Sequence, residues 1–281
     1  MNVISRSKTF SILRMALGVW LFIHFIFIFP EVKELYSLEG IKVAGGELYL
    51  APFLKTVRSA LGIQLLCSMA IVTSLGLIFK IKRRLCSLLL FLIWIFFFHQ
   101  NVLTYTPLHP FMGWILLAIS TVEENEVRFP WNKETKEFQY SAILFSGFWI
   151  ICACAYSSSG IQKFLFSPLW AKGMALELIL QYPSNRFDVI FQLFNKLPDI
   201  LKMMFNYYVL IFEGLFFISL FHQKLRKIFW FGILGMHLAI WLTLEFTELT
   251  FGMLIIHFFL IEENWFNNFG LGSFKWKIKK T

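Results

Sequence analysis

Eight apolar runs constrain what this chain can fold into. They lie near residues 10–29, 59–79, 85–105, 111–122, 140–159, 203–221, 228–246 and 250–263. A helix rises about 1.5 Å per residue, so about 20 apolar residues are needed to cross about 30 Å of hydrocarbon. The fourth and eighth runs are shorter, and we expect them to be broken, re-entrant or extended by polar turns. The runs predict an all-α, polytopic transmembrane helical bundle of about eight spans, with seven or six as alternatives.

The composition agrees with a membrane protein. Hydrophobic residues make up 58% of the 281 residues and aromatic residues 19%, with a mean hydropathy of +0.66. Such a chain is too apolar for a soluble globule with a charged surface. The net charge of +9 does not indicate a nucleic-acid partner, because the basic residues fall in short clusters between apolar runs. We expect the lipid bilayer as partner and a single membrane domain over residues 1–281, without a separate soluble domain.

The basic clusters also predict an orientation. With eight spans, all four clusters fall on one side, which is cytoplasmic by the positive-inside rule. They are Arg6 to Arg14, Lys80 to Arg84, His222 to Lys227 and Lys275 to Lys280. The loop from Glu123 to Gln139 lands on the same side but is acidic, so it neither supports nor opposes the assignment. Both termini are therefore expected inside.

Two longer connections, near residues 30–58 and 160–202, then form an outer vestibule. Both are mixed in charge and contain aromatic, glycine and proline residues. Within the second, residues 168–180 follow a proline start and predict one short amphipathic helix along the membrane interface.

The segment from Tyr156 to Gly173 contains our first candidate for a chemical group. It places Lys163 at the mouth of the fifth run, among small hydroxyl residues and aromatic rings. A charged side chain near hydrocarbon must find a partner, extend to water or lose its proton. Only the neutral amine can act as a base.

Other polar residues are expected in the same outer half of the membrane. They are Arg58 at the start of the second run, His99 and Asn101 at the end of the third, and His109 at the start of the fourth. Ionisable groups inside spans usually face a bundle interior or a water-filled cavity. Glu213, deeper in the sixth run, needs a partner, and a structural and a functional role are equally open.

A polar stripe is expected on the seventh span. His237, Trp241, Glu245 and Glu248 follow one another at intervals of four, four and three, which places them on one helical face. The stripe fits either interhelical hydrogen bonding or a functional site. His24 and His257 are interpreted as core histidines.

Metal and redox motifs are absent from the sequence. Histidine and cysteine spacings typical of metal sites do not occur, so we expect no metal. Four cysteines lie in or beside apolar runs and are interpreted as packing residues: Cys67, Cys86, Cys152 and Cys154. No further role is assigned to Cys152 and Cys154.

The pattern Tyr156-x-x-x-Gly160-Ile-x-Lys163, followed by Trp170 and Gly173, resembles the HTTM domain. This is the membrane part of vitamin K-dependent gamma-carboxylase and of short bacterial relatives, including the membrane protein needed to mature a secreted sporulation-delaying toxin. Asn101 and His109 before Gly113, and His237 before Gly252-Met253, extend the resemblance in order over nearly the whole chain.

The resemblance implies an enzyme in which Lys163 deprotonates a reduced quinone. Apolar burial, with Lys172 or Arg58 nearby, would favour the neutral amine this requires. His109 and His237 would be the other catalytic residues and would hydrogen-bond the quinol oxygens or the enolate. The side chains implied to surround the ring are Tyr156, Phe164, Trp170, His99, Asn101 and Trp241, with Glu213, Glu245 and Glu248 as further charges.

The implied cofactor is reduced vitamin K or menaquinol, with oxygen and carbon dioxide as candidate co-substrates. A quinone reductase would supply the quinol, and a secreted peptide or protein would be the substrate. The implied location is the bacterial cytoplasmic membrane, with the active face outside.

Two other functions compete with this one. The carboxylase carries a large lumenal substrate-holding domain, whereas this sequence ends soon after the eighth run. The chain could therefore be a non-catalytic factor for the maturation or export of a secreted peptide or toxin. A transporter using Glu213, Glu245 and Glu248 as a proton path is a third alternative, although no inverted repeat supports it.

Overall fold

The computed structural model describes residues 3–4, 7–41, 57–101, 104, 106–132, 138, 140–181, 186–261 and 265. Within these residues the chain is helical, apart from one short antiparallel pair between β1 (Val3–Ile4) and β2 (Tyr140–Ser141). The all-α prediction is therefore confirmed. The chain divides into two compact units, residues 1–141 with 276–281 and residues 142–275. The prediction of a single membrane domain stays a prediction.

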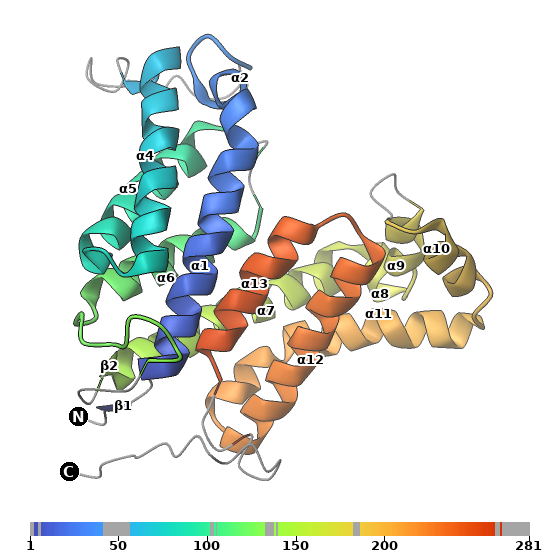
Figure 1. The fold of residues 1–281 in the computed structure, drawn as a ribbon. Helices are drawn as coiled ribbons and strands as arrows, with labels where there is room; N and C mark the ends of the chain where they lie inside the picture. The colour runs from blue at the N-terminus through green and yellow to red at the C-terminus, as the bar shows by residue number, and fades with distance from the viewer. Residues whose placement is uncertain are drawn as a thin grey trace. The chain divides into compact units, whose positions relative to one another are not determined.

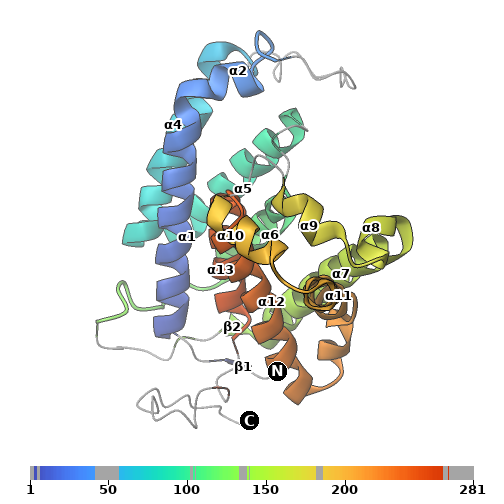
Figure 2. The same ribbon diagram turned by 90° about the vertical axis from the view of Figure 1, so that its right-hand side faces the viewer.

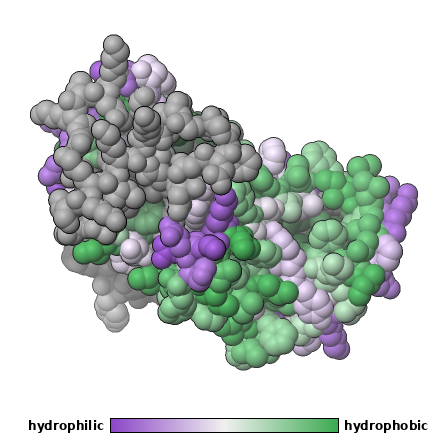
Figure 3. Space-filling view, turned by 90° about the horizontal axis from the view of Figure 1, so that it is seen from below, coloured by the Kyte–Doolittle hydropathy of each residue, from purple (hydrophilic) through white to green (hydrophobic). Residues whose placement is uncertain are grey.

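Among the residues that the structure describes, five helical stretches are long and apolar enough to cross a membrane: Thr9–Tyr36, Ala60–Phe79, Arg83–Gln100, Ala142–Phe166 and Gln223–Thr243. They make the chain compatible with an integral membrane protein. Figure 3 shows hydrophobic residues over much of the described surface seen from below, as expected where lipid replaces water. The expected fourth and eighth spans are the short helices Leu108–Thr121 and Thr247–Phe259. The count of eight and the orientation stay predictions.

The first unit is built from long helices packed in chain order. Its elements are α1 (Ser7–Ile28), η1 (Phe29–Glu31), α2 (Val32–Tyr36), α4 (Ala60–Phe79), α5 (Arg83–Gln100) and α6 (Leu108–Thr121). Helix α1 packs against α4, α4 against α5, and α5 against α6 (Figure 1). Leu17, Ile63 and Leu90 are fully buried between them.

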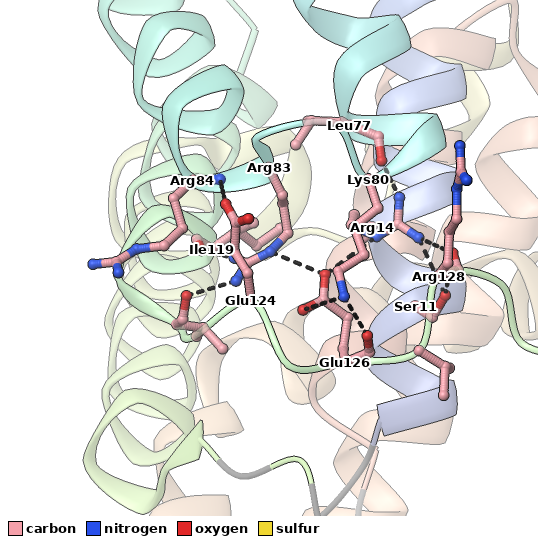
Figure 4. A network of polar contacts seen from close by, with 12 residues as sticks. Ser11, Arg14, Leu77, Lys80, Arg83, Arg84, Ile119, Glu124, Glu126 and Arg128 are labelled. Carbon is pink, nitrogen blue, oxygen red and sulfur yellow. Dashed lines mark hydrogen bonds and ion pairs between the residues drawn. The ribbon is translucent and has the colours of Figure 1, made fainter. Parts of the chain in front are cut away.

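A buried ionic cluster ties these helices together near one end (Figure 4). Glu126, in the segment after α6, lies with its Oε1 3.6 Å from Arg14 Nε and 3.0 Å from Arg83 Nε. All three side chains have no exposed surface. Lys80 adds a longer contact to Glu126, at 3.9 Å, and is itself 18% exposed. The negative charge of one buried carboxylate therefore compensates the positive charges of two buried guanidinium groups.

The two arginines of this cluster also cap helix ends. Arg14 donates to the carbonyls of Leu77 and Ile78, near the C-terminus of α4. Arg83 donates to the carbonyls of Ile119 and Val122, near the C-terminus of α6. Such carbonyls lack helical partners, and a cation there also opposes the negative end of the helix dipole. Arg14 and Arg83 were expected only to mark the cytoplasmic side, but both are buried parts of the unit. Arg6 and the Lys275 to Lys280 cluster lie outside the described residues.

The second unit is arranged around one long helix. Its elements are α7 (Ala142–Phe166), α8 (Pro168–Ala171), α9 (Ala175–Leu180), α10 (Asp188–Asn195), α11 (Asp199–Gly214), η3 (Phe216–Leu220), α12 (Gln223–Thr243) and α13 (Thr247–Phe259). Helix α7 packs against α11 and η3, and α12 packs against α13 and η3. Figure 2 shows α7 and α11 close together in a second view. Trp149, Cys152 and Phe216 form part of the buried core.

Three expected elements of this unit differ from the prediction. Helix α7 continues to Phe166, so Lys163 lies in its last turn and not after it. The sixth run forms α11, which ends at Gly214, followed by the 3-10 helix η3. The single helix expected over residues 168–180 is two short helices, because Gly173 adopts a left-handed φ of 75° and ends the first.

Helix α12 ends earlier than the seventh run predicts. Its last residue is Thr243, and Leu244 has extended backbone angles. Glu245 lies in the connection, and Glu248 lies in the first turn of α13. The prediction of a continuous stripe from His237 to Glu248 on one helix is therefore wrong, and only His237 and Trp241 share α12.

The predicted orientation can be tested by cysteine labelling. In a background without the native cysteines, we expect Lys172→Cys to react with a membrane-impermeant maleimide on intact cells. Lys82→Cys should react only after the membrane is opened, because the turn after α4 is expected inside. Both residues are exposed, so access is set by the membrane side. Labelling of Lys82→Cys on intact cells would refute the orientation.

Candidate functional site

The candidate site lies where α7 and α11 approach most closely. A Cβ atom placed on Gly160 would lie 2.2 Å from the backbone nitrogen of Gly214 and 2.6 Å from its Cα. Only glycine allows two helix backbones to come this close. Their approach brings the last turns of the two helices together and so fixes the side chains that flank the two glycines.

Lys163 and Glu213 form an ion pair at this crossing. Lys163 Nζ lies 2.7 Å from Glu213 Oε1 and 2.6 Å from Oε2. Ser159, one turn before Lys163 on α7, donates its hydroxyl to Glu213 Oε2 at 3.1 Å. The glutamate side chain is 6% exposed and the lysine side chain 28% exposed. The pair is therefore buried on the carboxylate side and reachable on the amine side.

Glu213 depends on this pairing for a further reason. It is in the last turn of α11, where the helix dipole is unfavourable for a negative charge. Lys163 is in the last turn of α7, where a positive charge is favourable. Lys163 therefore compensates both the burial of the carboxylate and its position in the helix.

An apolar groove is lined in part by Trp170, a neighbour of the Lys163 amine. Lys163 Nζ lies 5.1 Å from the centre of the Trp170 ring, within the range of a cation–π contact. Trp170 also lines a groove of about 660 Å³ formed by the segment from α8 to α9. The other lining residues are Ser167, Leu169, Ala175, Leu178, Ile179 and Gln181. The groove is thus largely apolar, and the amine contacts one of its lining residues, Trp170.

Of the expected neighbours of Lys163, the structure places Trp170 in contact with its amine. Phe164 is 55% exposed and Lys172 is also exposed. Arg58 belongs to the first unit. Among the described contacts, Lys163 is paired with the Glu213 carboxylate, whereas neighbouring cations were expected.

A second polar group lies further along α7. The Tyr156 hydroxyl lies 2.8 Å from His237 Nε2 and 3.4 Å from His257 Nε2. All three side chains are buried, at 6%, 4% and 1% exposure in that order. Trp230 donates its indole N–H to the His257 carbonyl at 2.8 Å. Tyr156 thus forms hydrogen-bond contacts with His237 and with His257, which the sequence interpreted as a core histidine.

The remaining predicted residues of the second unit lie outside this group. The Trp241 ring contacts Phe251, and the Arg186 guanidinium lies 5.7 Å from the centre of its ring. Glu245 and Glu248 are exposed. Arg186 donates to Thr247 and to the Leu244 carbonyl, which holds the connection between α12 and α13.

His99, Asn101 and His109 lie in the first unit. His109 stacks on Trp94 at 4.9 Å, and its carbonyl accepts from the Trp94 indole at 2.9 Å. His99 is exposed and lines, with His109 and Trp94, a cavity of about 230 Å³. Asn101 is buried and donates to the Leu35 carbonyl at 2.9 Å. Their predicted role beside Lys163 stays a prediction.

The sequence interpretation missed Ser159 and His257 as members of polar groups. Ser159 stands in the segment from Tyr156 to Gly173, four residues before Lys163, and this spacing could have indicated a shared partner. His257 gave no local signal, because its partner Tyr156 is 101 residues away.

No family model, no curated protein and no solved structure matches this chain.

Proposed function

We propose that the chain is a vitamin K-dependent gamma-carboxylase-like integral membrane enzyme that uses a reduced quinone and oxygen. The observation that carries the proposal is the Lys163–Glu213 pair beside the apolar groove lined by Trp170. The HTTM-like order of Tyr156, Gly160, Lys163 and Trp170 supports the same assignment. The active face would be the outer face of a bacterial cytoplasmic membrane.

The groove fits a quinone by size and lining. Binding pockets for small molecules are mostly apolar, have a few placed polar groups, and enclose about 300–1,000 Å³. The groove of about 660 Å³ falls in this range. Trp170 would cover the ring, Lys163 would face a ring hydroxyl, and Leu169, Leu178 and Ile179 would contact the apolar tail. When bound, the quinol would react with one oxygen molecule to give an epoxide and water.

The pair, and not an isolated amine, would handle the proton. As an ammonium and a carboxylate, Lys163 and Glu213 share one exchangeable proton and are neutral together. Transfer of that proton to Glu213 produces the neutral amine that can accept a proton from a substrate hydroxyl. The pair then ends as an ammonium and a carboxylic acid. Ser159 would hold the carboxyl group in place through the 3.1 Å contact.

The expected result is that Lys163→Ala lowers kcat for epoxide formation by about 100-fold or more, the usual effect of removing a general base. Glu213→Gln should also reduce it, because Lys163 then loses its proton acceptor. Lys202→Ala is the matched control, since Lys202 forms an ion pair with Glu177 in the same unit, at 3.5 Å. Purified protein with menaquinol and oxygen supplies the assay, with epoxide measured by mass spectrometry. Equal turnover by Lys163→Ala would refute the proposal.

A non-catalytic factor for peptide or toxin maturation is the second candidate. The observation that favours it is the ion pair itself, because Lys163 Nζ contacts both oxygens of the Glu213 carboxylate, as in a structural salt bridge. Lys163 would then be a docking or structural charge. Lys163→Arg separates the two functions, because arginine keeps the charge but does not release a proton. A factor tolerates this substitution in a peptide-maturation assay, whereas an enzyme loses epoxide formation.

A further inference from the structure

The Tyr156 hydroxyl lies between two buried imidazole rings. It is 2.8 Å from His237 Nε2 on α12 and 3.4 Å from His257 Nε2 on α13. The two ring centres are 5.4 Å apart. Tyr156 itself comes from α7, so the three side chains join three helices of the second unit. Their contacts form a linear chain, His257 to Tyr156 to His237.

The hydroxyl restricts the tautomers of the two rings. A phenol carries one proton, so if it donates to one of the two imidazole nitrogens, its hydrogen bond with the other nitrogen is one in which it accepts. When it donates to His237, the Nε2 of His237 is bare and its proton is on Nδ1. His257 then carries its proton on Nε2 and has a bare Nδ1. Reversing the hydroxyl reverses both tautomers.

The two Nδ1 atoms of His237 and His257, which point away from Tyr156 in this series of contacts, have no protein partner among the described residues. Both His237 Nδ1 and His257 Nδ1 are buried without a hydrogen bond. Buried polar atoms are usually satisfied by protein or by ordered water. In either arrangement one of these Nδ1 atoms is a donor and the other an acceptor. One end would therefore be satisfied by a water molecule that accepts a hydrogen bond, and the other by a water molecule that donates one.

We propose that Tyr156, His237 and His257 form a proton relay through the core of the second unit, with the two Nδ1 atoms as its ends. A proton arriving at His257 Nδ1 is matched by transfer of the Nε2 proton to the Tyr156 oxygen. The Tyr156 proton moves to His237 Nε2, and the Nδ1 proton of His237 leaves. One proton enters and one leaves, so no charge remains on the three side chains. After the transfer, the three side chains are in the reversed arrangement, which can carry the next proton in the opposite direction.

Other titratable groups lie close along the same helices. Cys152 is one turn before Tyr156 on α7, and Lys163 is two turns after it, paired with Glu213 of α11. The spacing from Tyr156 to Lys163 is about 10.5 Å along a helix. The relay does not rest on the quinol-dependent function, because it follows from the hydrogen-bond pattern alone.

The test is the tautomeric state of the two histidines in the full-length protein in lipid nanodiscs. Solid-state NMR of histidine labelled with ¹⁵N and ¹³C distinguishes Nδ1–H from Nε2–H, and His237→Asn and His257→Asn assign the two signals. We expect one ring of each tautomer, and exchange peaks that connect the two arrangements. Tyr156→Phe should abolish the exchange and leave each ring free to choose its tautomer.

Tyr208→Phe is the matched control, because the Tyr208 hydroxyl donates to the Gly232 carbonyl at 2.6 Å in the same unit. It should leave the exchange unchanged. A single fixed arrangement without exchange peaks would show a structural hydrogen bond and overturn the relay. Identical tautomers for both rings, or exchange that persists in Tyr156→Phe, would overturn it as well. These outcomes do not depend on epoxide formation, so failure of the relay and failure of the quinol-dependent function are distinguishable.

Discussion

Replacing Glu126 with glutamine is expected to lower the free energy of unfolding of the first unit by about 3–5 kcal/mol. The substitution keeps the side-chain shape but removes the negative charge that both Arg14 and Arg83 contact. All three side chains lack exposed surface, so water cannot replace the lost partner. Breaking a buried pair costs more than a surface pair because the remaining charge is left uncompensated.

The unfolding of this unit can be followed through Cys67. This thiol is buried in α4, so its reaction with a fluorescent maleimide during heating or denaturation reports opening of the first unit. The other cysteines are replaced by serine. Glu124→Gln is the control, because Glu124 is exposed and accepts from the Arg84 backbone. It should change stability by less than about 1 kcal/mol. An equally small effect of Glu126→Gln would contradict the buried-cluster account.

Replacing Gly160 with alanine is expected to destabilise the second unit by about 3 kcal/mol, at the upper end for overpacking. The added methyl group would lie 2.2 Å from the Gly214 nitrogen, and a backbone atom cannot rotate away. The helices α7 and α11 must therefore separate. This also lengthens the Lys163–Glu213 contact, so epoxide formation should fall together with stability.

Gly147→Ala is the control for this substitution. Gly147 is in the same helix, but a Cβ atom there meets nothing within 4 Å. Alanine should leave stability unchanged or raise it by up to about 1 kcal/mol, as expected from helix propensity. Reactivity of Cys152, fully buried in α7, reports opening of the second unit. Equal stability of the two variants would show that α7 and α11 do not cross closely at Gly160.

The sequence predicted the helical class and indicated Lys163 as a candidate, but it did not predict the partner of Lys163. Long apolar runs are a strong local signal, and a lysine next to such a run is conspicuous. Glu213 is 50 residues away, and the two are joined only because α7 and α11 cross at two glycines. A crossing of this kind depends on tertiary packing, which spacing along one helix does not reveal.

The predicted stripe from His237 to Glu248 failed for a related reason. Intervals of four, four and three fit a helix even when the chain leaves the helix between them. Leu244 is extended, and Glu248 begins a new helix, where an acidic residue in the first turn is favourable. Thr247 and Glu248 could therefore have indicated a helix start.

The buried ionic cluster was not predicted, because its arginines were interpreted only as markers of the cytoplasmic side of the membrane. Arg14 and Arg83 flank apolar runs, where basic residues usually mark the cytoplasmic side. Acidic residues contribute little to that rule, so Glu126 carried no weight. The fold uses all three to join α1, α5 and the segment after α6. Burial and pairing of charges can be read only from the packed structure.

Quinone binding next to Lys163 is the central claim, and extraction of the purified protein tests it most directly. Organic extraction followed by mass spectrometry should recover menaquinone with the wild-type protein in a stoichiometric amount. Trp170→Ala should lose most of it, because Trp170 lines the groove and contacts Lys163. Lys202→Ala should retain it. A protein that carries no quinone, and binds none when menaquinone is added, would contradict the account.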